Sequence, residues 1–117
     1  MNILGIGNAI VDVICKVEDN FIVQNGLTKS TMKLIFDEAE FKKLLSNLKI
    51  EKTVSGGSVA NSIVGLSQLG NKVGFIGKVC DDDLGAKYEE GLKSENVEYF
   101  YSKKKEELPT GTCLILI

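Results

Sequence analysis

Apolar and polar positions in the first half of the chain predict strands followed by one amphipathic helix. Short apolar runs over residues 3–7, 10–17 and 31–36 predict strands, the last two from partial alternation of apolar and polar side chains. A turn-rich connection is expected between the second and third of these strands. After Asp37, apolar residues recur at helical spacing, with Asp37 as the N-cap and Glu40 completing a capping box.

The second half of the chain continues the mixture of helices and strands. Small and apolar residues occur almost all round a helix predicted over residues 58–69, so we expect that helix to be buried on most sides and to end at Gly70. The other predicted elements are a strand over 72–79, a charged surface helix over 81–96, and strands over 97–101 and 112–117. This order predicts an α/β fold.

The length and the charge of the chain narrow the class of protein. A chain of 117 residues suits one domain. Its 14 basic and 16 acidic residues give a net charge of −2, which argues against a nucleic-acid surface, and the one basic cluster, residues 103–105, is expected to be a solvated loop. No apolar run reaches the roughly 20 residues of a membrane helix. The first residues indicate a strand rather than a signal peptide, so we expect a cytoplasmic protein.

Three cysteines and the absence of histidine limit the candidate chemistry. Cys15, Cys80 and Cys113 lie far apart in the sequence, which argues against a zinc site, and no other metal site is predicted. Cys15 and Cys113 lie in apolar runs, where we expect them to pack as small core residues.

The last residues, 114–117, are four consecutive large apolar side chains. This pattern indicates either a segment of a larger protein or a strand that another subunit covers. Because unpaired strand edges invite pairing with another chain, we expect a homodimer or a larger homo-oligomer.

The stretch GIGNAIVD, residues 5–12, does not match a dinucleotide fingerprint, because the third glycine is missing and a strand follows. Asn8 and Asp12 together offer a carboxamide and a carboxylate, which suit a vicinal diol of a sugar. The alternative is a turn asparagine beside an aspartate on an exposed strand face, and the residues alone leave both interpretations open.

The stretch SGGSVANS, residues 55–62, places two glycines before a helix. Gly56 and Gly57 permit close backbone approach by a ligand, and the free N–H groups of the helix start can bind an oxygen-rich group. Asn61 lies about one turn further along. No lysine follows, so this is not a phosphate-binding P-loop. A hinge with Asn61 bonded to local backbone is the alternative, and it also stays open.

Several motifs in order carry a family resemblance. GNAIVD, GGSVANS, LGNKVGFIGKV with the following DD and LG, and PTGTC resemble the N-terminal part of the pfkB (ribokinase-like) kinases of sugars and nucleosides, most closely the adenosine-kinase branch. The resemblance covers essentially all 117 residues. The chain departs from the family pattern at Val59 and Ile63, where small residues are usual, and at Cys80, where glycine is usual.

The resemblance implies an α/β domain with a small β-sheet lid, within a single truncated ribokinase-like unit over residues 1–117. The strands at approximately 11–17, 31–36, 97–101 and 111–117 would supply much of the lid, with some continuing into the main sheet, and Gly56–Gly57 would form the hinge. The implied substrate is a sugar or nucleoside, phosphorylated on a hydroxymethyl group. Its implied contacts are Asn8, Asp12, Gly56, Gly57, Ser58 and Asn61.

The resemblance also implies ATP and Mg²⁺ as cofactors of a complete family member. In the family, the catalytic aspartate belongs to a GAGD-type motif that this sequence lacks, so we assign no catalytic residue and expect the chain alone to be inactive. Asp81, Asp82 and Asp83 are interpreted as helix caps. The alternative function is a non-catalytic oligomeric module assembled through lid or terminal strands.

Overall fold

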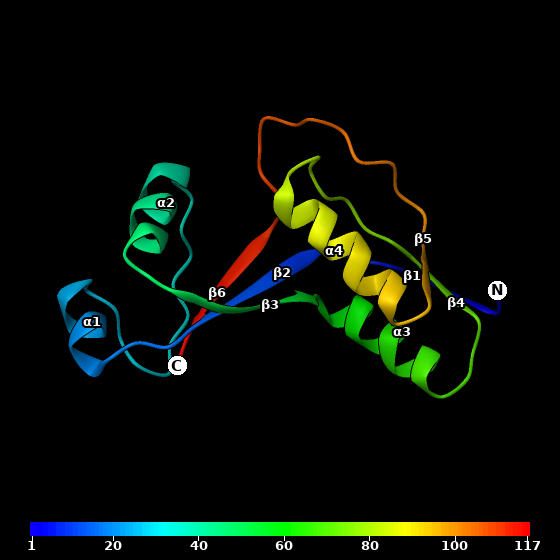
Figure 1. Cartoon of the computed structure of the whole chain (residues 1–117), viewed down its shortest axis with the longest axis horizontal. Helices are drawn as coiled ribbons and strands as arrows, with labels where there is room; N and C mark the ends of the chain where they lie inside the picture. The colour runs from blue at the N-terminus through cyan, green and yellow to red at the C-terminus, as the bar shows by residue number, and fades with distance from the viewer. The chain divides into compact units, whose positions relative to one another are not determined.

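Strands and helices are mixed along the chain in the computed structural model, which describes all residues from Met1 to Ile117 (Figure 1). The elements are β1 (Ile3–Ile6), β2 (Ile10–Cys15), α1 (Asp19–Gln24), α2 (Glu38–Ser46), β3 (Ile50–Gly56), α3 (Ser58–Gln68), β4 (Val73–Ile76), α4 (Asp83–Ser94), β5 (Val97–Tyr99) and β6 (Thr112–Leu116). One unit comprises Met1–Asp12 and Thr53–Cys113, and the other Val13–Lys52 and Leu114–Ile117. The predicted α/β class is confirmed.

The core of the first unit lies between a parallel sheet and two helices. The sheet has the order β1-β4-β5, and Gly5, Phe75 and Tyr99 lie side by side across it. A side chain at Gly5 would lie 2.5 Å from Ile63 on α3, and the rings of Phe75 and Tyr99 both pack near Tyr88 on α4. Both helices therefore cover the same face of the sheet.

A second sheet has the strand order β3-β2-β6. In the first unit, the Val11 N–H donates to the Gly111 carbonyl at 2.8 Å. In the second unit, the Ile117 N–H donates to the Cys15 carbonyl at 2.9 Å. The partners advance together along both strands, so β2 and β6 run parallel. Two of the strands assigned to a lid are thus paired neighbours.

Of the two other strands assigned to the lid, one is absent and the other belongs to the parallel sheet. Residues 31–36 form no strand, and Phe36 is 92% exposed. Alternation supplies the side-chain pattern of a strand, but a strand also needs a neighbouring backbone to bond with, and no strand pairs with this segment. The segment predicted over 97–101 does contain a strand, β5, but it pairs with β4 in the parallel sheet rather than with β2 or β6.

The helices of the second unit were predicted in part. The turn-rich connection after β2 contains the short helix α1. Asp37 caps α2 as predicted, accepting a hydrogen bond from the Ala39 N–H at 2.9 Å. Glu40 does not complete the capping box, because it pairs with Lys33 at 3.3 Å instead.

The helices of the first unit begin and end close to their predicted residues, but the expected burial of α3 on most sides is wrong. Only Ala60 and Ile63 of that helix are buried, and Leu69 directly after it is 80% exposed. Gly70 follows with φ 89°, the left-handed conformation expected for a terminating glycine. No helix of the chain combines the length and the apolar character that crossing a membrane demands.

Candidate functional site

The first group of predicted site residues lies where β1 turns into β2. Along β2, buried Val11 and Val13 alternate with half-buried Asp12, so the strand period turns the Asp12 side chain to the other face. Asn8 is exposed in the turn. Neither side chain takes part in a hydrogen bond or ion pair within the chain, so both are available to a ligand.

The two glycines at the end of β3 bring this turn and the start of α3 together. A side chain at Gly56 would lie 2.7 Å from the Asp12 carboxylate oxygen Oδ2. Gly57 has φ 102° and ψ 136°, and a side chain there would clash with the Asn8 carbonyl oxygen. Glycine is therefore required at Gly57 by close approach and by backbone conformation, whereas a side chain at Gly56 would displace the Asp12 carboxylate.

The start of α3 leaves backbone donors free. Gly57 is the N-cap and has no side chain to accept a hydrogen bond. The first helical bond runs from the Asn61 N–H to the Gly57 carbonyl at 2.9 Å, so the N–H groups of the three residues before Asn61 have no partner within the helix. The side chains of Ser58 and Asn61 are exposed in this first turn.

Together these residues offer groups that are able to bind hydroxyls. The Asp12 carboxylate accepts hydrogen bonds, the α3 N–H groups donate them, and the amides of Asn8 and Asn61 do both. Asp12 lies against Gly56, and the Asn8 backbone lies against Gly57. Ser58 and Asn61 follow in the first turn of α3, of which Gly57 is the N-cap.

Helix α4 anchors the end of β3 from within the core. The Tyr88 hydroxyl donates to the Gly56 carbonyl at 3.1 Å, and the Ser55 hydroxyl donates to the Tyr88 carbonyl at the same distance. Burial raises the pKa of Tyr88 to about 12, so the hydroxyl keeps its proton and its donor role at neutral pH.

A second anchor holds the loop that leads into β6. The Asp82 carboxylate caps α4 by accepting from the Gly85 N–H at 2.7 Å, as the sequence predicted. It also accepts from the Thr110 hydroxyl at 2.6 Å and the Thr110 N–H at 2.9 Å. Burial tends to raise the pKa of Asp82, but these hydrogen bonds outweigh it and hold that pKa below its ordinary value.

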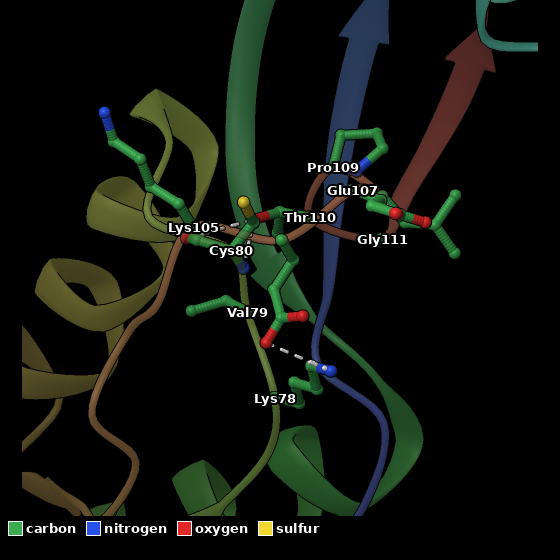
Figure 2. Close-up of a pocket in the computed structure, with 10 residues that line it drawn as sticks. Lys78, Val79, Cys80, Lys105, Glu107, Pro109, Thr110 and Gly111 are labelled. Carbon is green, nitrogen blue, oxygen red and sulfur yellow. Dashed lines mark hydrogen bonds and ion pairs between the residues drawn. The ribbon is translucent and has the colours of Figure 1, made fainter.

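An open cleft of about 640 Å³ lies beside this loop (Figure 2). Two of the residues that line it, Lys78 and Glu106, form an ion pair at 3.3 Å. The residues that line the cleft are Lys78, Val79, Cys80 and Lys105–Gly111. None of the predicted substrate contacts lines this cleft, so the candidate site is the β1–β2 turn and the start of α3.

Most of the chain matches one known protein family. Residues 6–117 match the model of the pfkB family carbohydrate kinases. The chain belongs to this family. The resemblance stated from the sequence motifs is confirmed, and so is the ribokinase-like fold.

Solved pfkB-type structures share the arrangement of the whole chain. A probable sugar kinase from Rhizobium etli CFN 42 is 34% identical and superposes with a TM-score of 0.83, covering 98% of this chain and 34% of that one. An adenosine kinase from Sinorhizobium meliloti is 33% identical, with a TM-score of 0.82, covering 98% of this chain and 35% of that one.

A curated pfkB relative matches a shorter stretch. The 5-dehydro-2-deoxygluconokinase of Mesomycoplasma hyopneumoniae strain 7448 is 33% identical over 96 residues, which is 82% of this chain and 27% of the relative. This chain thus spans about a quarter to a third of the length of these kinases.

The burial predicted for one cysteine is wrong. Cys113 was expected in the core, but it is exposed on β6. Partial burial and then the negative charge of Asp12, the candidate diol ligand, raise the pKa of the Cys113 thiol. The parallel register of β2 and β6 brings them together, and the sequence of either strand alone carries no signal for it.

Proposed function

We propose that this chain carries the substrate-binding part of an ATP-dependent kinase that phosphorylates a hydroxymethyl group of a sugar or nucleoside. The observation that supports it most directly is the Asp12 carboxylate, which lies against Gly56 without a partner in the chain. Asp12 accepts hydrogen bonds from two neighbouring hydroxyls, and Asn8 and Asn61 bind further ones. Ser58 and the free N–H groups of α3 complete the proposed contacts.

The kinase family implies ATP and Mg²⁺ for the full enzyme, but the residues present form no metal site. No three carboxylate, cysteine or histidine side chains of this chain lie so that they could hold a metal ion. The carboxylate of Asp82 is occupied by Gly85 and Thr110. We therefore propose that the chain alone does not transfer phosphate.

Titration of the ¹⁵N-labelled chain with ribose, fructose and adenosine tests substrate binding. We expect the amide signals of Gly57, Ser58 and Asn61 to shift with at least one ligand. The Asp12→Asn variant should bind that ligand about ten- to a hundredfold more weakly, since a hydrogen bond to a charged group contributes about 1.5–3 kcal/mol.

Asp83→Asn is the matched control, because Asp83 is an exposed carboxylate in the first turn of α4. Its variant should bind like the unchanged chain. The proposed site would be contradicted if none of the three ligands shifted these amide signals. It would also be contradicted if Asp12→Asn bound the ligand as tightly as the unchanged chain.

A coupled assay for ADP formation tests the expected inactivity. With the same three ligands, ATP and Mg²⁺, the 117-residue chain should show no turnover above the background without protein. Steady ADP release that depends on one of the ligands would show that these residues suffice for catalysis.

The homo-oligomeric module and the cytoplasmic location predicted from the sequence stay predictions. The unpaired edges of β3 and β6 in the order β3-β2-β6 support the first. Light scattering of the chain in solution decides whether it self-associates.

A further inference from the structure

The peptide that joins Gly56 to Gly57 lies at the centre of the candidate site. Gly56 ends β3, and Gly57 is the N-cap of α3 with φ 102°. A peptide between two glycines is weakly restrained by its own residues, because glycine adopts positive and negative φ about equally. The orientation of this peptide therefore depends on contacts with other residues.

One such contact comes from the aromatic core. The Tyr88 hydroxyl on α4 donates to the Gly56 carbonyl at 3.1 Å, and no other hydrogen bond of the chain uses this hydroxyl. Tyr88 is fully buried, and a buried hydroxyl is costly unless it is hydrogen-bonded. A phenylalanine ring would fill the same space, so the hydroxyl serves this one bond.

The same bond determines the direction of the Gly57 N–H. The C=O and N–H groups of a trans peptide point in opposite directions, and the chain contains no cis peptide. Because the Gly56 carbonyl is directed at Tyr88 in the core, the Gly57 N–H is directed away from the core. This N–H takes part in no hydrogen bond within the chain, so it is a free donor.

A flip of this peptide would reverse the arrangement. It would break the bond to Tyr88 and replace the outward donor by a carbonyl oxygen. The Asp12 carboxylate, which lies against Gly56, also only accepts hydrogen bonds. The flipped site would therefore present two acceptors to a hydroxyl ligand instead of an acceptor and a donor.

Ser55 adds a second bond between α4 and the end of β3. Its hydroxyl donates to the Tyr88 carbonyl at 3.1 Å, so Tyr88 is bonded to this segment through both its main chain and its side chain. A side chain at Gly91, further along α4, would clash with the Ser55 hydroxyl oxygen. The helix thus approaches the end of β3 closely enough to hold it at two points.

We propose that Tyr88 is a positioning residue of the candidate site, whose hydroxyl holds the Gly56–Gly57 peptide so that the Gly57 N–H is presented to a ligand hydroxyl. Tyr88 itself lies in the core and does not touch the ligand. This inference rests on the proposed function, since it concerns the same site.

Tyr88→Phe tests the proposal, because it removes the hydroxyl and keeps the ring, whose centre lies 6.3 Å from that of Phe75 and 6.1 Å from that of Tyr99. In titrations with ribose, fructose and adenosine, the variant should bind about two- to tenfold more weakly than the unchanged chain, which corresponds to one neutral hydrogen bond. Without ligand, the ¹⁵N-amide signal of Gly57 should shift or broaden.

Tyr99→Phe is the matched control. Tyr99 belongs to the same aromatic cluster, and its hydroxyl donates to the carbonyl of Gly77, which is not a predicted substrate contact. This variant loses the same kind of bond, so its stability should fall to a similar extent. Its ligand affinity and its Gly57 amide signal should stay unchanged, whereas a purely structural role of Tyr88 would make the two variants alike.

Ser55→Ala provides a second variant that leaves the Tyr88 hydroxyl in place. It removes the other bond between α4 and the end of β3, so it should produce the same changes as Tyr88→Phe to a smaller extent. Circular dichroism verifies that each variant is folded.

Equal affinity of Tyr88→Phe and the unchanged chain overturns the proposal, as does an equal loss of affinity in both tyrosine variants. An unchanged Gly57 amide signal in ligand-free Tyr88→Phe also overturns it, whether or not a ligand binds. Failure of all three ligands to bind the unchanged chain contradicts the proposed function instead. The signal of the ligand-free chain therefore keeps the two failures distinguishable.

Discussion

Gly57 is the residue on which the candidate site depends most. Its φ of 102° lies in a region that residues with a side chain rarely adopt, and the Asn8 carbonyl oxygen occupies the space of a side chain. The same residue begins α3, which carries Ser58 and Asn61. A change at this one position therefore strains the backbone and displaces both halves of the site.

Gly57→Ala should lower the free energy of unfolding by about 1–3 kcal/mol, because it adds backbone strain to a steric clash. Chemical denaturation measures the change. Gly65→Ala is the control, since Gly65 lies within α3 and a side chain there meets no atom within 4 Å. That variant should be unchanged or more stable by up to about 1 kcal/mol, reflecting the higher helix propensity of alanine.

Equal destabilisation by the two alanines would contradict the special role of Gly57. So would a Gly57→Ala variant as stable as the unchanged chain, because it would show that the backbone adopts an ordinary conformation at this position.

At the scale of elements, Asp82 joins the start of α4 to the loop before β6. Its two oxygens accept hydrogen bonds from Gly85 and from both the hydroxyl and the N–H of Thr110. Thr110 is the buried polar residue of the chain, at 3% exposure, and its hydroxyl accepts from the Cys80 N–H at 3.0 Å. This network fixes where β6 begins beside β2.

Asp82→Asn should lower the free energy of unfolding by about 1–3 kcal/mol at pH 7. The carboxylate accepts three hydrogen bonds, whereas the NH₂ group of the asparagine amide cannot accept any and would face at least one of these donors. The folded pKa of Asp82 is lowered, so its stabilisation is full above the ordinary value of 3.8 and is lost as the pH falls through the lower folded pKa. The difference between variant and unchanged chain should therefore shrink below about pH 4.

Urea unfolding at pH 7 and at pH 3 measures this difference. Asp83→Asn, the exposed neighbouring carboxylate, should change stability by no more than about 0.5 kcal/mol at either pH. A destabilisation by Asp82→Asn that is equally large at both pH values would refute the electrostatic explanation.

At the scale of the whole molecule, the two units differ in how their helices are buried. Neither α1 nor α2 has a buried residue. In the other unit, α4 buries Gly85, Tyr88 and Leu92 against the aromatic core. Because local opening is easiest where few apolar contacts are lost, the helices of the second unit should open more readily than α4.

Amide hydrogen exchange tests this difference. The amides in the middle of α2 should exchange at least about tenfold faster than those in the middle of α4, which corresponds to at least about 1.4 kcal/mol in opening free energy. Equal protection in both helices would show that α2 is stabilised by contacts other than burial of its own side chains.

Local signals in the sequence predicted much of the fold and the candidate site. Asp37 and Asp82 were identified as caps because a cap depends on one side chain and the next few N–H groups. Gly57 and Gly70 were identified because glycine is common where φ is positive. The order of motifs also identified the family, since it covers the whole chain.

Pairing between strands far apart in the sequence decided which segments became strands and which residues came together. The strand period is present in residues 31–36, but no neighbouring strand pairs there, while β5 joined β4 because that position buries Val97 and packs Tyr99 against Phe75. Cys113 came beside Asp12 only through the register of β2 and β6. A sequence specifies which faces of an element are apolar, but the partner that covers each face depends on contacts between residues far apart in the chain.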